Sequence, residues 1–180
     1  MVRNRFNERK ATQVAARFLK AADGKLEYLS VIKLMYFADR EALLRWGTPI
    51  TNDRYYSLDH GPVLSHVKNL IDESSSSFWN QHIAAPSDYK ISIVKDPGDD
   101  QLSVAEEKLI DEIYEKNRAL NWWGLRNKSH ELPEWKNPEG SSVPIEIDDI
   151  LRAAGIKKKE RERIERELEG YRAMDALAVD

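Results

Sequence analysis

The sequence predicts an α+β domain that is mainly helical and carries one small antiparallel β-sheet. Apolar residues recur at intervals of three and four over most of the chain, which is the spacing of amphipathic helices. Helix start and stop signals divide these stretches into short elements. Strict alternation of apolar and polar residues, the pattern of a half-buried strand, is confined to residues 79–95, and a short extended segment at 52–57 is expected to join the same sheet.

The first two helices are expected over residues 9–22 and 26–45. Each ends on a clear stop signal: Asp23-Gly24 follows the first helix, and Gly47 follows the second, with Pro49 just beyond it. Glycine adopts the left-handed conformation at a helix end without a steric penalty, and proline cannot continue a helix. Because the link between them is short, the two helices predict an αα-hairpin.

Gly61 and Pro62 are expected to open a third helix. Proline suits the first helical turn because its missing N–H has no partner inside the helix there. Val63 and Val67 lie four residues apart and would face the second helix from this position. The Gly-Pro motif is therefore expected to set the direction in which the third helix enters the core.

The predicted β-sheet depends on two alternating runs, at residues 79–83 and 89–93. A short segment that contains Pro86 separates them, and proline is a common residue of such connections. This arrangement predicts a β-hairpin.

Ser103 and Glu106 form a predicted capping box at the start of a helix that runs to about residue 117. In this motif the serine oxygen accepts from the third helical N–H, and the glutamate side chain accepts from the N–H of the cap residue. Two shorter helices are expected after it, one at 121–129 and one around Ile150 that ends at Gly155.

The end of the chain, residues 157–180, is expected to be a charged helical extension of a domain that spans residues 1–156. Oppositely charged residues recur four apart in this extension, which supports a solvent-exposed helix. A sparse apolar stripe that includes Ile164, Leu168 and Tyr171 either packs back on the domain or binds another protein.

Composition excludes several classes of protein. The chain has 180 residues, of which 41% are hydrophobic and 33% charged, with a net charge of −3. This balance is that of a globular protein rather than a collagen-like or fully disordered one, and no apolar run reaches the roughly 20 residues of a membrane-spanning helix. Cysteine is absent, which excludes disulfides and zinc–thiolate sites. The basic N-terminus has no apolar stretch behind it, so a cytoplasmic location is expected.

The charges are distributed unevenly. Residues 1–25 contain seven Lys or Arg against Glu8 and Asp23, a net charge of +5, whereas residues 96–115 contain eight acidic residues against Lys108, a net charge of −7. The basic start predicts either a solvated first helix or a local arm for nucleic acid or an acidic partner.

No catalytic or metal-binding constellation is visible in the sequence. The four histidines, His60, His66, His82 and His130, lack the spacing that places two metal ligands on one helix face. No glycine-rich phosphate loop and no nucleophile motif occurs. We therefore expect no metal, no cofactor and no enzymatic activity.

The aromatic residues are more informative. Several lie at the ends of predicted elements, where side chains are less committed to the core. Neighbouring side chains on a helix point about 100° apart, so Trp122 and Trp123 cannot easily face one core together. Exposed aromatic residues are also enriched in protein-binding surfaces. Partner contact is therefore expected at Tyr55, Tyr56, His60, Trp122 and Trp123.

Three segments, in this order, resemble the Panacea domain family, also called SocA-like or phage-associated GepA-like. KLMYFA at residues 33–38 is similar to the family's helix reading KLLYFA, and HGPV at 60–63 is similar to its [YH]GPV segment. The capping box, Ser129-His130 and the Pro-Glu-Trp segment at 133–135 are similar to its third motif, and the order and spacing hold over about residues 10–156. The residues that carry the resemblance are Lys33, Tyr36, Gly61, Pro62, Val63, Val67, Ser103, Glu106, His130 and Trp135.

The resemblance implies an antitoxin of a type II-like toxin–antitoxin system. Such a protein neutralises a cognate protein toxin, encoded nearby, by direct protein–protein contact. Family members are paired with many unrelated toxins, and some look like adaptors that deliver a toxin to a protease. The resemblance leaves open whether a protease or chaperone, or a second copy of the chain, is a further partner, and it implies no membrane.

Two alternatives come from other functional classes. A DNA-binding regulator of its own operon would use the basic first helices, although these helices are too apolar to spare a face for reading bases. A hydrolase would need a His/Asp site that is assembled only in the folded chain.

Overall fold

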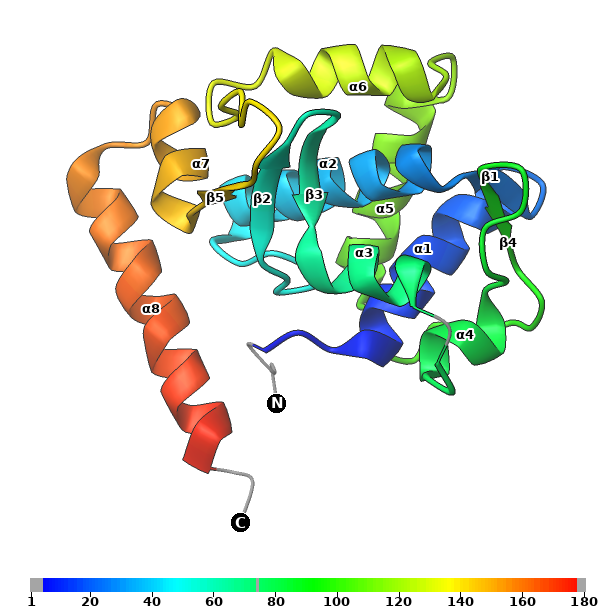
Figure 1. The fold of residues 1–180 in the computed structure, drawn as a ribbon. Helices are drawn as coiled ribbons and strands as arrows, with labels where there is room; N and C mark the ends of the chain where they lie inside the picture. The colour runs from blue at the N-terminus through cyan, green and yellow to red at the C-terminus, as the bar shows by residue number, and fades with distance from the viewer. Residues whose placement is uncertain (1–4, 74, 178–180) are drawn as a thin grey trace.

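The structure is a computed structural model that describes residues 5–73 and 75–177 (Figure 1). The start of the basic N-terminal segment (residues 1–4), residue 74 and the end of the predicted extension (residues 178–180) lie outside the described residues. The elements in chain order are α1 (Glu8–Ala21), β1 (Lys25–Glu27), α2 (Tyr28–Trp46), β2 (Tyr55–Leu58), β3 (Gly61–Leu64), α3 (Ser65–Asp72), α4 (Phe78–His82), β4 (Lys90–Ser92), α5 (Val104–Asn117), α6 (Trp122–His130), β5 (Val143–Ile145), α7 (Ile147–Ala153) and α8 (Lys158–Leu177).

The prediction of a mainly helical α+β fold is confirmed. Helix α2 runs through the middle of the domain, and α1, α5, α6 and strand β3 pack against it (Figure 1). Every residue of α2 from Ser30 to Asp39 is buried. A helix that is buried around its whole circumference is a core helix rather than a surface helix. The other elements are therefore assembled on α2.

The predicted ends of the first two helices are confirmed. Gly47 follows α2 with φ 74°, in the left-handed region, and its N–H donates to the carbonyl of Leu43 at 2.9 Å. Gly24, which follows α1, also has a positive φ. The short strand β1 lies in the link between the two helices, which pack against each other.

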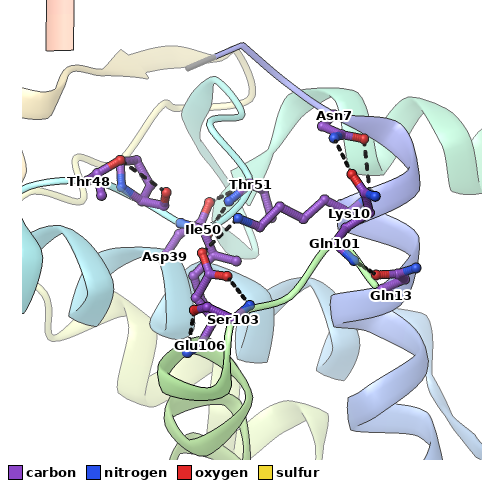
Figure 2. Close-up of polar contacts among 11 residues, drawn as sticks. Asn7, Lys10, Gln13, Asp39, Thr48, Ile50, Thr51, Gln101, Ser103 and Glu106 are labelled. Carbon is purple, nitrogen blue, oxygen red and sulfur yellow. Dashed lines mark hydrogen bonds and ion pairs between the residues drawn. The ribbon is translucent and has the colours of Figure 1, made fainter. Parts of the chain in front are cut away.

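Hydrogen bonds join α1 to the segment that leads into α5 (Figure 2). The Asn7 side chain accepts from the backbone N–H of Lys10 at 3.1 Å, which caps α1, and it donates to Gln101 at 3.2 Å. Lys10 Nζ lies 2.7 Å from a carboxylate oxygen of Glu106. Glu106 and Ser103 form the predicted capping box, with both of its hydrogen bonds present. The start of α5 is therefore fixed both within its own turn and against α1.

The β-hairpin predicted at residues 79–95 is wrong in its first half. Residues Phe78–His82 form α4, and the side chain of Ser77 caps this helix by accepting from the N–H of Asn80. The second half supplies β4, which pairs antiparallel with β1, far earlier in the chain. Only an isolated bridge between Ile83 and Ile93 joins the two predicted runs. The helix cap at Ser77 outweighs the alternation of apolar residues.

The extended segment predicted at 52–57 is present as β2, shifted by three residues at its start. It lies in a separate three-stranded antiparallel sheet with the order β3-β2-β5 rather than in the sheet of β4. Each edge strand of this sheet contains a proline, Pro62 in β3 and Pro144 in β5. Proline is tolerated at a sheet edge because no neighbouring strand requires its missing N–H.

The prediction that Gly61 and Pro62 open a helix is wrong. Both residues lie in β3, and α3 begins only at Ser65. A Gly-Pro pair has the same local pattern in either setting, since proline suits both a first helical turn and an edge strand. Val63 and Val67 are nevertheless buried, as predicted, from a strand and a helix respectively.

Helices α7 and α8 pack against each other at one side of the domain (Figure 1). The apolar stripe of α8 has two parts. Ile164, which lies over Gly47, and Leu168 are buried, whereas Tyr171 and Met174 are exposed. The stripe therefore packs back on the domain over its first half only. The boundary between residues 156 and 157 remains a prediction.

Candidate functional site

The sequence motifs meet beneath the β2–β3 hairpin, in a set of residues that we call the motif cluster: Lys33, Gly61, Pro62, Ser129, His130 and Trp135. Lys33, in α2, is 1% exposed, and its Nζ donates to the carbonyl oxygen of Pro62 at 2.7 Å. Burial lowers the pKa of Lys33 to about 7, and the positive charge of Arg126 acts in the same direction. The amine ties α2 to strand β3.

Gly61 is a position that requires glycine. Its φ is 96°, and a Cβ there would overlap the hydroxyl of Ser129 and lie 3.1 Å from Lys33 Nζ. Ser129 is itself held in place, because its hydroxyl donates to the carbonyl of Arg126 at 2.7 Å. The hairpin backbone therefore lies directly against α6, which runs across the turn end of the hairpin in Figure 1.

His130 and Trp135 complete the motif cluster by stacking. Their rings lie 3.9 Å apart at an interplanar angle of 9°, and the Trp135 indole donates to the carbonyl of Leu58 at 3.1 Å. Burial and the nearby charges of Arg126 and Lys33 lower the pKa of His130, so the neutral ring is favoured. Its Nε2 is buried without a hydrogen-bond partner within the described chain. The indole fixes the last residue of β2 to the segment after α6.

A buried carboxylate anchors the same segment to α2. The side chain of Glu134 is fully buried and accepts from Arg40 Nε at 2.6 Å and from the Tyr36 hydroxyl at 3.1 Å. Burial and the Glu134 carboxylate raise the pKa of Tyr36, which keeps the hydroxyl protonated as a donor. Tyr36, a motif residue, therefore acts as a structural anchor.

Asp39 forms a second buried clamp, between α2 and the segment before β2 (Figure 2). Its carboxylate accepts from the backbone N–H groups of Ile50 and Thr51 at 3.1 and 2.9 Å, from the Thr51 hydroxyl and from the Tyr55 hydroxyl at 2.9 Å. Burial raises the pKa of Asp39 to about 6, and these hydrogen bonds oppose the rise. Tyr55 is 4% exposed, so the expectation that it lies on the surface is wrong.

Three of the five expected contact residues do lie together, with Arg126, in what we call the tip surface: His60, Trp122, Trp123 and Arg126. His60 is exposed at the hairpin turn, and its ring centroid lies 6.2 Å from that of Trp122. Trp122 and Trp123 meet edge to face at 5.1 Å, and Trp123 is half exposed. The Arg126 guanidinium lies 4.7 Å from the Trp123 ring, in a cation–π arrangement. Asn121 caps α6 and so sets the position of both indoles.

Tyr56, the fifth expected residue, lies apart from the tip surface. It is half-buried on β2 and lines a hollow of about 710 Å³ near the start of that strand. The expected contact residues thus fall into three places: the core, the hollow and the tip surface.

The structure also contains polar residues in or beside the core that the sequence reasoning missed: Asp39, Thr51 and Glu134, which are buried, and Arg40, which is partly buried. A signal existed for three of them. Asp39 and Arg40 directly follow the KLMYFA segment, and Glu134 lies inside the third motif. Charged residues that interrupt or follow an apolar stretch are seldom buried unless they are paired. Thr51 had no such signal.

The basic first helix is largely neutralised by the acidic segment 96–115. Arg9 pairs with Asp100, Arg17 with Glu107 and Asp111, and Lys20 with Asp96. Their N–O distances are 2.7–3.0 Å. These pairs account for the opposite charges of the two segments and leave α1 poorly suited to bind a nucleic-acid backbone.

One His/Asp contact bears on the hydrolase alternative. His66 Nδ1 lies 2.7 Å from Asp53 Oδ1 at the edge of the hollow that Tyr56 lines. The same carboxylate accepts from the backbone N–H groups of Arg54, His66 and Val67. Asp53 therefore acts as a cap for the start of α3. Within residues 5–73 and 75–177, no group of His, Asp and Glu side chains is arranged to hold a metal ion.

These features define a class of protein first: a mainly helical α+β domain in which motif residues fasten a β-hairpin to a core helix. A family model described as "Antitoxin SocA-like, Panacea domain" matches residues 31–136, more than half of the chain. The chain belongs to this antitoxin-like family, which confirms the resemblance seen in the sequence. Neither the curated proteins nor the solved structures include a match. None of the helices in the described part of the chain has the length and hydropathy needed to span a membrane.

The matched region contains the whole motif cluster and the tip surface. It ends one residue after Trp135, whose indole binds the carbonyl of Leu58 at the end of β2. Helix α1, strand β5 and helices α7 and α8 lie outside it.

Proposed function

We propose that the protein is a non-enzymatic cytoplasmic antitoxin of a type II-like system, which binds a cognate protein toxin and thereby neutralises it. Membership of the antitoxin-like family is the observation that carries this proposal. The family makes the chain an antitoxin-like domain, and the toxin partner and the system type are proposed from that membership.

The tip surface is the proposed contact site within this function. Trp122 and Trp123 offer a large aromatic area whose side chains have few rotatable bonds, so ordering them on binding costs little entropy. Arg126 adds a guanidinium next to them, and its Nε is buried without a partner in the described residues. Aromatic and arginine side chains are the residues most enriched among binding hot spots. Tyr56 and His60 are further contact candidates.

The test of the function is co-expression with the protein encoded by the adjacent reading frame. We expect that protein to stop growth when expressed alone, and the chain to restore growth and to copurify with its partner. A neighbour that is harmless alone, or that is toxic but neither rescued nor copurified, would refute the proposal.

The test of the site is Trp123→Ala, with Tyr89→Ala as the control. Tyr89 is an exposed aromatic residue in the turn before β4, away from the tip surface. A hot-spot residue costs about 2 kcal/mol or more on truncation, roughly a 30-fold loss of affinity. We expect this loss for Trp123→Ala and none for Tyr89→Ala, measured by biolayer interferometry on the purified complex. Equal affinities of the toxin for both variants would show that the tip surface is not the contact site.

The exposed half of α8 is the competing site for the same function. Tyr171, Met174 and Leu177 lie three residues apart on one helix face and are exposed, a spacing that suits insertion into an apolar groove on a partner. Replacing Tyr171, Met174 and Leu177 with serine removes this face and keeps Ile164, Leu168 and Arg172 in place. Neutralisation that survives the replacement supports the tip surface, and neutralisation that is lost in a folded protein supports the apolar face of α8.

A further inference from the structure

The hollow that Tyr56 lines has an unusual set of charges. It has a volume of about 710 Å³ and lies between the N-terminal segment, the start of β2, β5 and the distal part of α8. Three arginines line it from three separate elements: Arg5 before α1, Arg54 before β2 and Arg172 in α8.

These three arginines lack the carboxylate partner that most other arginines in the described chain have. Eight of the thirteen arginines in residues 5–73 and 75–177 form an ion pair with a carboxylate, such as Arg17 with Asp111 at 2.7 Å. The three that line the hollow are among the five that do not. A guanidinium presents a planar set of donors that matches a carboxylate or phosphate. Three such groups therefore line one hollow without a carboxylate partner in the described chain.

The acidic residues of the same hollow do not cancel this charge. Asp53 is buried and engaged by His66 and by three backbone N–H groups. Glu146, just before α7, is the other carboxylate in the lining. Three guanidinium groups against these two carboxylates leave an excess of positive charge.

The hollow continues into a second one. A neighbouring hollow of about 930 Å³ shares Arg5 and Asn52 with it and extends to the end of α2. Trp46, which is 43% exposed, and Pro49 give this second part an apolar wall. We call the two hollows together the basic groove. Arg9 and Lys10 also line the second part, but both pair with carboxylates, Asp100 and Glu106. Two adjoining hollows suit an extended polypeptide better than a compact small ion.

We propose that the basic groove receives an acidic segment of a partner polypeptide, with its carboxylates against Arg54 and Arg172 and its apolar residues toward Trp46. The proposal rests on the proposed function, because that partner is the neutralised toxin. It adds a second contact region that lies largely outside the family match: Arg5 and Arg172 fall outside residues 31–136, and Arg54 falls within them.

The segment is expected to bind through its side chains rather than as an added strand. Strand β5 is the edge of its sheet beside the groove, and it has Pro144 at its centre. A proline offers no N–H to an incoming strand, so β5 is a poor template for strand addition. Charge complementarity at the arginines is then the main source of recognition.

The direct test uses a fluorescein-labelled peptide of twelve residues in which Glu alternates with Ala, and a matched peptide with Gln in place of Glu. The variants are Arg54→Glu and Arg172→Glu in the full chain. Arg166→Glu is the control, since Arg166 is an exposed arginine on the same helix as Arg172, without a carboxylate partner in the described chain and outside the groove. Inorganic pyrophosphate serves as a competing small anion.

We expect the Glu peptide to bind the wild-type chain and Arg166→Glu alike, at least 10-fold more weakly to Arg54→Glu and Arg172→Glu, and more weakly still as salt rises. The Gln peptide should not bind. A Glu peptide that does not bind the wild-type chain, or that binds all variants equally, overturns the proposal. Binding of pyrophosphate in the groove without binding of the peptide also overturns it, in favour of a small anionic ligand.

The complex with the toxin separates the two proposals. If wild-type chain and toxin copurify and Arg54→Glu with Arg172→Glu retains the same affinity, the groove proposal fails and the antitoxin proposal stands. If the wild-type chain binds no protein from the adjacent reading frame, the antitoxin proposal fails, and with it the identity of the partner assigned to the groove.

Discussion

The motif cluster and the basic groove lie at opposite ends of strand β2, and their polar side chains are used in different ways. In the motif cluster, Lys33 binds a backbone carbonyl and the Trp135 indole binds another. In the basic groove, Arg54 and Arg172 have no carboxylate partner among the described residues. The first region holds the chain together, whereas the second leaves its donors available.

The two regions also differ in how much of each lies within the family match. The match covers the motif cluster completely but leaves Arg5 and Arg172 outside. Residues that identify the family are therefore mostly residues that build the fold. Of the two proposed contact regions, the groove has two of its three unpaired arginines outside the matched region, whereas the tip surface lies within it.

The largest effect on stability is expected at the clamp that joins α2 to β2. Asp39→Ala would leave the N–H groups of Ile50 and Thr51 and the Tyr55 hydroxyl without their acceptor inside the core. Each buried unsatisfied donor costs roughly 1–3 kcal/mol, so we expect a loss of about 4 kcal/mol in the free energy of unfolding, measured with urea. The control is Asp111→Ala, whose exposed ion pair with Arg17 should cost less than about 1 kcal/mol. Similar losses for both variants would contradict the framework role of Asp39.

The next effect is expected at the hairpin turn. Gly61→Ala would combine a strained positive φ with overlap on Ser129 and Lys33, and we expect a loss of about 3 kcal/mol. Gly140→Ala is the matched control, because Gly140 also has a positive φ but no atom within 4 Å of the added Cβ. It should cost about 1 kcal/mol from backbone strain alone. Equal losses in the two variants would show that the hairpin can move away from α6.

A smaller, pH-dependent effect is expected from Lys33. Its pKa is about 7 in the folded chain against an ordinary value of 10.5, so between these limits the unfolded chain binds more protons. Stability should therefore rise with pH above about 7, and by about 1–2 kcal/mol between pH 7.5 and 9. Lys33→Met should remove this rise, whereas Lys108→Met, at an exposed position, should keep it. Parallel stability–pH curves for the wild-type chain and Lys33→Met would contradict a buried, bound amine.

The smallest effect on stability is expected in the groove. Arg54→Ala and Arg172→Ala remove exposed side chains that have no carboxylate partner in the described structure, so the free energy of unfolding should change by less than about 0.5 kcal/mol. A loss of more than about 1.5 kcal/mol in either variant, seen in thermal or urea unfolding, would mean that the groove also belongs to the framework. The comparison between the two regions would then fail.

The helices were predictable because their signals are local. The stop at Gly47 and the capping box of Ser103 and Glu106 each involve residues within a few positions of one another. Such contacts are encoded in the order of the chain and need no knowledge of the rest of the fold. The end of α2 and the start of α5 lie within a residue of the predicted positions, whereas the start of α3 and the whole of α4 were not predicted.

The strands were harder because their partners are distant. Residues 90–92 pair with 25–27 rather than with their neighbours, and no local period contains that information. The Gly-Pro motif predicts a helix from its local pattern, whereas its strand pairing with Ser57 and Leu58 and the bond from Lys33 to Pro62 involve other elements. A local pattern is compatible with both settings, and the tertiary contact selects one.

The candidate site was predictable in part for the same reason. The grouping of His60 with Trp122 and Trp123 required only that residues at element ends be near one another, whereas the burial of Tyr55 depends on the carboxylate of Asp39. The groove could not be predicted, because Arg5, Arg54 and Arg172 come from three places in the sequence and share no motif.

The hydrogen bond between the Trp135 indole and the Leu58 carbonyl also limits when β2 can be fixed in place during synthesis. The two residues are 77 positions apart, and the ribosome adds about 5–20 residues per second. A growing chain therefore needs roughly 4–15 s after Leu58 is made before Trp135 exists to hold it. During this interval the Leu58 carbonyl lacks its indole donor, although Lys33 can bind the Pro62 carbonyl as soon as β3 has been made. A partner that recognises the finished arrangement of hairpin and α6 can therefore bind it only after residue 135 has been added.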